Sequence, residues 1–163
     1  MVAPVLIFAV GNESRGDDAL GPLLLRQLES WLVAKGCAEQ FELLEEFQLQ
    51  VEHAMDMKDR QLVLFIDAGM NTRTPLGFYR AQLNETPVLY SHALEPEALL
   101  KVYTQFYEET PPAVFILCIC GESFELGESL STRAVDHLAL SLEFSKQLLQ
   151  QAHAADWDNV RTH

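Results

Sequence analysis

The sequence predicts an α/β protein, in which helices cover both faces of a mostly parallel β-sheet. Three observations support this fold class. Short, continuously apolar runs, which are typical of strands buried on both faces, recur along the 163 residues. Segments with apolar residues at helical spacing separate these runs, as expected where right-handed crossovers join parallel strands. Apolar residues make up 48% of the chain and charged residues 21%, a globular composition.

The first half of the chain alternates strand and helix patterns. Three runs predict strands: residues 5–10, 41–44 and 62–66. Between the first two runs, residues 18–35 have apolar side chains at helical spacing, and Gly36 is a typical helix stop. The stretch QVEHAMDMKD, residues 50–59, predicts a short helix before the third strand.

The second half continues the alternation. Residues 77–83 alternate weakly and predict an edge strand, whereas residues 114–120 (VFILCIC) form the most strongly β-like segment. Two further helices are expected: residues 96–106 and residues 130–153. The last ten residues are polar, so we expect a frayed end on which Trp157 alone is suited to dock. One domain is expected across residues 1–163.

Charge and cysteine content restrict the partners and the compartment. The formal charge of −13 arises from 24 acidic and 11 basic residues, and it disfavours nucleic acids and anionic membranes as partners. The sequence shows neither a membrane-spanning run nor a signal peptide, so we expect a cytoplasmic monomer. Three cysteines argue against a disulfide framework. Cys118 and Cys120 share one strand face, where buried core thiols are favoured over a metal pair.

The segment GNESRGDDALG follows the first strand and brings two adjacent carboxylates, Asp17 and Asp18, to a strand-to-helix turn. A helix N-terminus attracts anions, so a turn that already carries carboxylates suits a cation better than a phosphate. We expect Asp17 to cap the helix.

The motifs GxGxxG, GxxxxGK[ST], GxSxG and HExxH are absent from the sequence, which argues against a dinucleotide site, a P-loop, a nucleophile elbow and an ordinary zinc peptidase.

Asp18, Asp67 and His92 form the candidate site. Ligands of parallel sheets collect at the carboxyl ends of strands, and Asp67 at the end of a buried strand is costly unless it is paired or solvated. If the first and third strands are neighbours, Asp18 and Asp67 face each other and His92 completes three ligands for Ni²⁺, Zn²⁺ or Fe²⁺. The structural alternatives are a helix cap for Asp18 and an inert loop residue for His92, with His53 as a reserve ligand.

Four segments carry a resemblance to a known family: FAVGNESRGDDALGP, LVLFIDAG, YSHAL and ILCICGESFELGESLS. Over about the first 130 residues, their order and spacing make the chain resemble the NiFe-hydrogenase maturation endopeptidases. The resemblance implies a three-layer α/β sandwich of the phosphorylase/hydrolase-like type, with a mostly parallel, twisted, five-stranded sheet. It also implies an aspartic-type or metal-assisted endopeptidase, which removes a short C-terminal peptide from the nickel-loaded precursor of a hydrogenase large subunit.

The resemblance also implies roles for the candidate residues. Asp18, Asp67 and His92 match the family's groups that recognise nickel held by the precursor, and the enzyme itself has no permanently bound metal. A free carboxylate, Asp18 foremost, is the candidate general base. The chain departs from the family at EEFQLQVEHA, where many relatives have a Gly-rich segment, and this loop is a candidate specificity element. We predict four substrate-binding residues: Gly11, Asn12, Glu46 and Gln48.

Other functions stay open at this point. A non-catalytic nickel-binding chaperone would escort the same precursor without cutting it. A peptidyl-tRNA-hydrolase-like enzyme also has a glycine-asparagine turn after its first strand, but the net charge and the paired aspartates argue against tRNA. A Mg²⁺-dependent phosphoryl-transfer domain would use strand-end aspartates, yet GESFELGES offers no lysine after the late strand.

Overall fold

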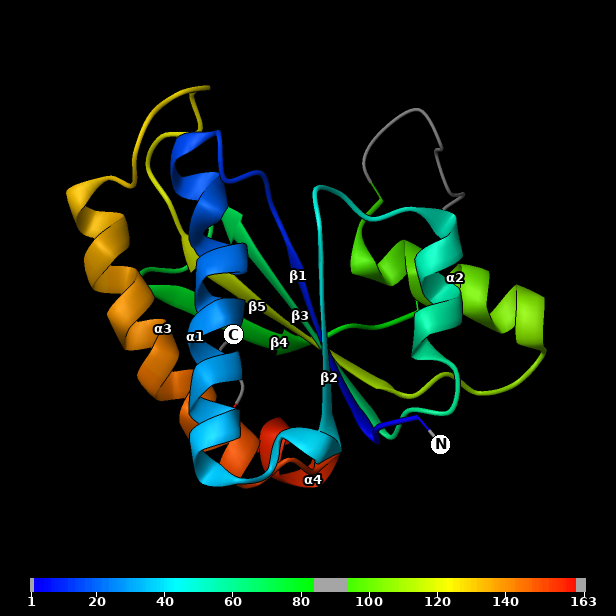
Figure 1. Cartoon of the computed structure of the whole chain (residues 1–163). Helices are drawn as coiled ribbons and strands as arrows, with labels where there is room; N and C mark the ends of the chain where they lie inside the picture. Colours follow the sequence, from blue (N-terminus) through cyan, green and yellow to red (C-terminus); the bar gives the residue numbers. More distant parts are fainter. Residues whose placement is uncertain (1, 84–93, 161–163) are drawn as a thin grey trace.

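The computed structural model describes residues 2–83 and 94–160, and these residues contain a five-stranded sheet (Figure 1). The strands are β1 (Val5–Val10), β2 (Phe41–Glu46), β3 (Leu62–Gly69), β4 (Leu76–Arg80) and β5 (Ala113–Cys120). Their order across the sheet is β2-β1-β3-β5-β4, and only the pairing of β4 with β5 is antiparallel among these strands. The mostly parallel sheet and its edge strand are therefore confirmed.

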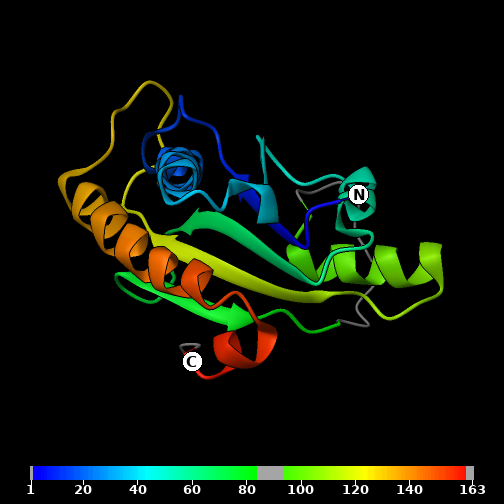
Figure 2. The same cartoon turned by 60° about the horizontal axis from the view of Figure 1, so that its bottom comes forward.

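Helices cover both faces of this sheet (Figures 1 and 2). The helical elements are η1 (Gly16–Ala19), α1 (Leu20–Lys35), η2 (Ala38–Gln40), η3 (Val51–Met57), α2 (Pro96–Tyr107), α3 (Thr132–Gln150) and α4 (Ala154–Asp158). Helices α1 and α3 lie on one face, and α2 and η3 lie on the other. Gly36 ends α1 with a φ of 74°, as predicted. Within the described residues, no helix has the length and apolar character needed to span a membrane.

The core is divided between the two faces because successive strand residues point to opposite sides. Ile7, Leu64 and Leu117 pack with α1 and α3, whereas Leu6 and Ile116 pack on the side of α2 and η3. This alternation explains why the strands read as continuous apolar runs, since both sides of each strand are buried. The predicted three-layer sandwich is confirmed.

Two elements differ from the sequence prediction near the candidate site. The third strand does not end at Asp67 but continues to Gly69, because β5 offers pairing partners along its full length, with Asp67 opposite Cys118. The helix predicted from Asp18 begins as an α-helix only at Leu20, and Asp18 lies in the 3-10 turn η1. Both aspartates are therefore held by regular hydrogen-bonded backbone.

The sequence predicts a frayed C-terminal end, but residues 154–160 pack against the rest of the protein. Trp157 in α4 is 1% exposed, and its indole N–H donates to the Leu148 carbonyl at 2.9 Å. Its ring meets those of Phe78 and Phe115 edge-on. His137 lies on α3 and is buried. Large aromatic burial explains why this polar segment becomes ordered.

Candidate functional site

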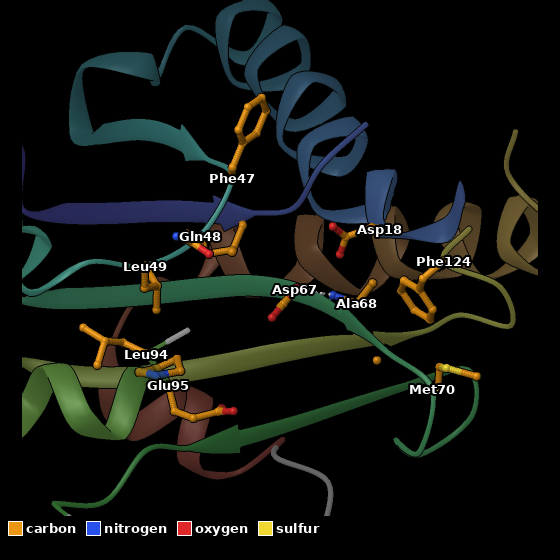
Figure 3. A pocket seen from close by; sticks show the side chains of 13 residues that line it. Asp18, Phe47, Gln48, Leu49, Asp67, Ala68, Met70, Leu94, Glu95 and Phe124 are labelled. Atoms are coloured by element: carbon orange, nitrogen blue, oxygen red, sulfur yellow. Dashed lines mark hydrogen bonds between the residues drawn. The ribbon is translucent and has the colours of Figure 1, made fainter. Parts of the chain in front are cut away.

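A cavity of about 420 Å³ lies at the carboxyl ends of β1 and β3 (Figure 3). The chain leaves β1 for β2 on one side, and β3 lies on the other side of β1, so this is the switch point of the sheet. Asp18 from η1, Asp67 from β3 and Glu95 before α2 line the cavity. The first and third strands are neighbours, which is the condition on which the candidate site depended, and this brings the two predicted aspartates to one site.

Asp67 projects from β3 into this cavity (Figure 3). Burial raises the pKa of the Asp67 carboxyl to about 7, and the negative charges of Asp18 and Glu95 add to the shift. The Ala68 N–H donates to the carboxylate at 2.7 Å and offsets only part of this effect. At neutral pH this group is therefore poised between its protonated and ionised forms.

Asp18 shares the cavity and is held by the turn that follows β1. The Asn12 N–H donates to its carboxylate at 2.7 Å. Burial raises the pKa of Asp18, and the Asn12 hydrogen bond and the charge of Arg15 counteract only part of the shift. Gly11 has a φ of 155°, and a Cβ there would lie 2.1 Å from the Asp18 carbonyl oxygen. Only glycine allows this close approach, so Gly11 is required to place Asp18.

Asp17 does not cap its own helix, and this prediction is wrong. Its buried carboxylate reaches across to the loop after β5, where it accepts hydrogen bonds from the Glu122, Ser123 and Ser131 N–H groups and from the Ser131 hydroxyl. Burial raises the pKa of Asp17, but these hydrogen bonds outweigh burial and leave the pKa below its ordinary value. The loop is thereby tied to η1.

The four predicted substrate-binding residues have different positions. Gln48 lines the cavity, whereas the side chain of Glu46 does not. The Glu46 carbonyl accepts from the Gly11 N–H at 3.0 Å, so its backbone fixes the same turn. The Asn12 side chain accepts from the Ser14 N–H at 2.9 Å. Gly11, Asn12 and Glu46 therefore build the turn around Asp18, and their contact with substrate stays a prediction.

His92 lies outside the described residues, so the three-ligand set stays a prediction. Among the described residues, no group of three or more His, Cys, Asp and Glu side chains is placed to hold a metal ion. The reserve ligand His53 accepts from the Gln50 N–H at 2.9 Å. Cys118 and Cys120 are both free thiols. Asp18 and Asp67 thus both line the cavity, and their role as metal ligands stays a prediction.

Sequence reasoning missed several residues that line the cavity: Phe47, Met70, Glu95 and Phe124. Glu95 directly precedes Pro96 at the start of α2, and this position before a predicted helix was the signal that could have found it. The other three lie in loops, where no periodic pattern identifies the residues that return to a site. Phe47 nevertheless belongs to the segment EEFQLQVEHA, which the sequence offered as a specificity element.

Solved structures of hydrogenase maturation endopeptidases have a similar fold. HybD, a hydrogenase maturating endopeptidase from E. coli, has a TM-score of 0.69 and 21% identity, covering 93% of this chain and 94% of that one. The NiFe-hydrogenase maturation protease HycI from Thermococcus kodakarensis has a TM-score of 0.67 and 18% identity, covering 91% and 93%. A hydrogenase 2 maturation peptidase from a Thaumarchaeota archaeon has a TM-score of 0.62 and 19% identity, covering 89% and 97%.

The chain has the fold of these maturation endopeptidases. The likeness extends over nearly the whole length of both partners, and it confirms at the level of the fold the resemblance noted in the sequence. No family model and no curated protein sequence matches the chain. At less than 25% identity, proteins that share a fold can differ in activity, so the activity is argued from the site.

Proposed function

We propose that this protein is an endopeptidase of NiFe-hydrogenase maturation, which removes a short C-terminal peptide from the nickel-loaded precursor of the large subunit. One observation carries the proposal. Two carboxyls with raised pKa values, Asp18 and Asp67, share a cavity in a fold that the solved maturation endopeptidases also have. The motifs around both aspartates are those that make the sequence resemble this family.

The electrostatics of the cavity suit a cation that arrives with the substrate. The charges of Asp18 and Glu95 each repel that of Asp67 in a partly buried space, and this repulsion is among the causes of the high pKa of Asp67. Nickel held by the precursor would relieve the repulsion and favour the ionised forms. Binding free energy is then available only when the precursor carries metal, which would time cleavage after nickel insertion. His92, outside the described residues, is proposed as the third contact.

The same carboxyls can move the protons that hydrolysis requires. The oxygen of a water molecule bonds to the carbonyl carbon of the scissile peptide, one carboxylate accepts the proton of that water, and the proton passes to the leaving amine as the C–N bond breaks. A group with a pKa near neutral is best suited to both transfers. Asp67, whose pKa is about 7 before the metal arrives, therefore joins Asp18 as a candidate for this role.

Intact-mass spectrometry of the precursor tests the proposal. The nickel-loaded and nickel-free precursors are each incubated with the wild-type protein, with Asp18→Asn and with Asp136→Asn. Asp136 is an exposed residue on α3 and serves as a matched control for the change of charge. We expect loss of a C-terminal peptide with the wild type and the control, only from the nickel-loaded precursor, and none with Asp18→Asn.

Two results would contradict this function. If the wild type binds the nickel-loaded precursor tightly but releases no peptide, the protein is an escort rather than a protease. If Asp18→Asn cleaves at the wild-type rate, the carboxyl pair is not the reacting site. Cleavage of the nickel-free precursor would instead remove nickel from the mechanism while leaving the protease in place.

A further inference from the structure

Three loops bring large apolar side chains to the mouth of the acidic cavity. Phe47 follows β2, Met70 follows β3 and Phe124 follows β5, and all three line the cavity. Phe47 is 74% exposed and Met70 is 61% exposed, while Phe124 is half-buried. We call these three side chains the apolar rim. In the view of Figure 3, Phe47 and Met70 lie on opposite sides of Asp18 and Asp67.

The loop that carries Phe47 is anchored at both ends. On one side the Glu46 carbonyl accepts from the Gly11 N–H at 3.0 Å. On the other side Leu49 is 5% exposed, and the Gln50 N–H donates to the ring of His53 at 2.9 Å. The chain on both sides of Phe47 is held by burial or hydrogen bonds, yet the ring of Phe47 is exposed to solvent. The backbone therefore presents this side chain outward.

Phe124 is fixed by a different anchor, which supports the same conclusion. The carboxylate of Asp17 accepts from the N–H groups of Glu122 and Ser123, immediately before Phe124. The ring is thereby held over the same cavity that Asp18 lines. Two adjacent aspartates thus serve two parts of one site, because Asp17 places part of the rim and Asp18 supplies charge inside.

Such a surface has the composition of a recognition site. Aromatic residues and methionine are enriched at protein interfaces, and burying one large apolar side chain commonly changes affinity by roughly tenfold. Between the apolar side chains lie the carboxyls of Asp18, Asp67 and Glu95. A complementary ligand therefore carries positive charge at its centre and apolar groups on its flanks, a combination that a free metal ion cannot supply.

We propose that the apolar rim docks a large apolar side chain of the precursor, in the extended segment next to its metal-binding residues. This inference rests on the proposed function and adds the substrate chemistry that the protein selects. The metal is recognised by the carboxyls inside the cavity, and the neighbouring polypeptide is recognised by the apolar rim. Loss of the rim should therefore weaken binding without slowing the chemical step.

Steady-state kinetics with the nickel-loaded precursor separates these two contributions. Phe47→Ser and Met70→Ser are compared with Phe106→Ser, a control on α2 that is 68% exposed and does not line the cavity. All three positions are well exposed, so we expect these variants to fold. We expect KM to rise roughly fivefold to tenfold for each rim variant with kcat within about twofold of the wild type, and no change for the control.

A double-mutant cycle identifies the partner side chain. Apolar residues that flank the cleavage site of the precursor are changed to serine one at a time and tested with wild type and Phe47→Ser. At the docked position, the substrate change should raise KM for the wild type and have little further effect with Phe47→Ser. Additive effects at every position tested would overturn the docking proposal.

The outcomes distinguish this inference from the proposed function. If the wild type cleaves and the rim variants have an unchanged KM, the rim is not a docking surface although the protease is established. If the wild type binds the precursor through Phe47 without cleaving it, the rim is supported and the protease is rejected. If the wild type neither binds nor cleaves, both proposals are overturned.

Discussion

Asp17 and Asp18 are neighbours in the sequence, but the structure gives them opposite electrostatic environments. Asp17 is buried and accepts four hydrogen bonds from the loop after β5, which keep its pKa low. Asp18 accepts one from Asn12, lines a cavity with Asp67, and has a raised pKa. The number of hydrogen-bond donors around a carboxylate therefore distinguishes one that stabilises the fold from one that remains available to a ligand.

We expect the largest effect on the cleavage rate, when the carboxyls that line the cavity are replaced. Asp18→Asn and Asp67→Asn should each slow cleavage of the nickel-loaded precursor by roughly 10³-fold, because an amide neither binds a cation well nor transfers the proton. Their free energies of unfolding should stay within about 1 kcal/mol of the wild type, because neither change leaves a network of buried donors unpaired. Single-turnover cleavage and urea unfolding measure the two quantities. Strong destabilisation by either variant would show that its carboxyl supports the fold, as Asp17 does.

The second prediction tests the structural carboxyl. Asp17→Ala should lower the free energy of unfolding by about 3 kcal/mol, because the N–H groups of Glu122, Ser123 and Ser131 lose their acceptor. Urea denaturation measures the loss, and Asp136→Ala on the exposed face of α3 is the matched control. A loss no greater than that of the control would show that the loop is held by other contacts.

The third prediction follows from the low pKa of Asp17. Because the folded-state pKa of Asp17 lies below its ordinary value of 3.8, the ionised carboxylate stabilises the folded state above that value. This contribution should disappear as the pH falls through the folded-state pKa. Unfolding free energies measured from about pH 5 to about pH 2 should fall more steeply for the wild type than for Asp17→Asn. Parallel curves would contradict the assignment.

The smallest expected effect concerns the coupling between the two site carboxyls. The charge of Asp18 contributes to raising the pKa of Asp67 to about 7, after the larger contribution of burial. Asp18→Asn should therefore lower the pKa of Asp67 without restoring its ordinary value. Carboxyl-carbon NMR across the pH range measures this shift, and Asp136→Asn should leave it unchanged. An unaltered Asp67 titration in Asp18→Asn would show that the two groups are electrostatically independent.

Part of the site could be predicted from local sequence. Asp18 follows an apolar run and precedes a helical pattern, and Asp67 follows another apolar run. These patterns are local, so they identify strands and helices wherever burial and backbone geometry agree. Once the strands are parallel, their carboxyl ends meet at one edge, and the two aspartates meet with them.

The other part depends on contacts between distant segments. The hydrogen bonds of Asp17 join residues 105 to 114 positions apart, so no local motif could distinguish it from a helix cap. Glu95 and Phe47 line the cavity only because their loops return to it. Asp67 proved to lie inside its strand for the same reason, since the pairing with β5 continues past it.

The amino-acid sequence was enough to predict the α/β class, the strand and helix segments and the candidate aspartates, because periodic burial is reflected in local composition. The folded arrangement was needed to show which aspartate has its hydrogen bonds satisfied and which is open, how far the pKa of Asp67 rises, and which apolar side chains surround the cavity. Those properties depend on desolvation and on the donors that other segments supply, and both arise only when the chain is packed.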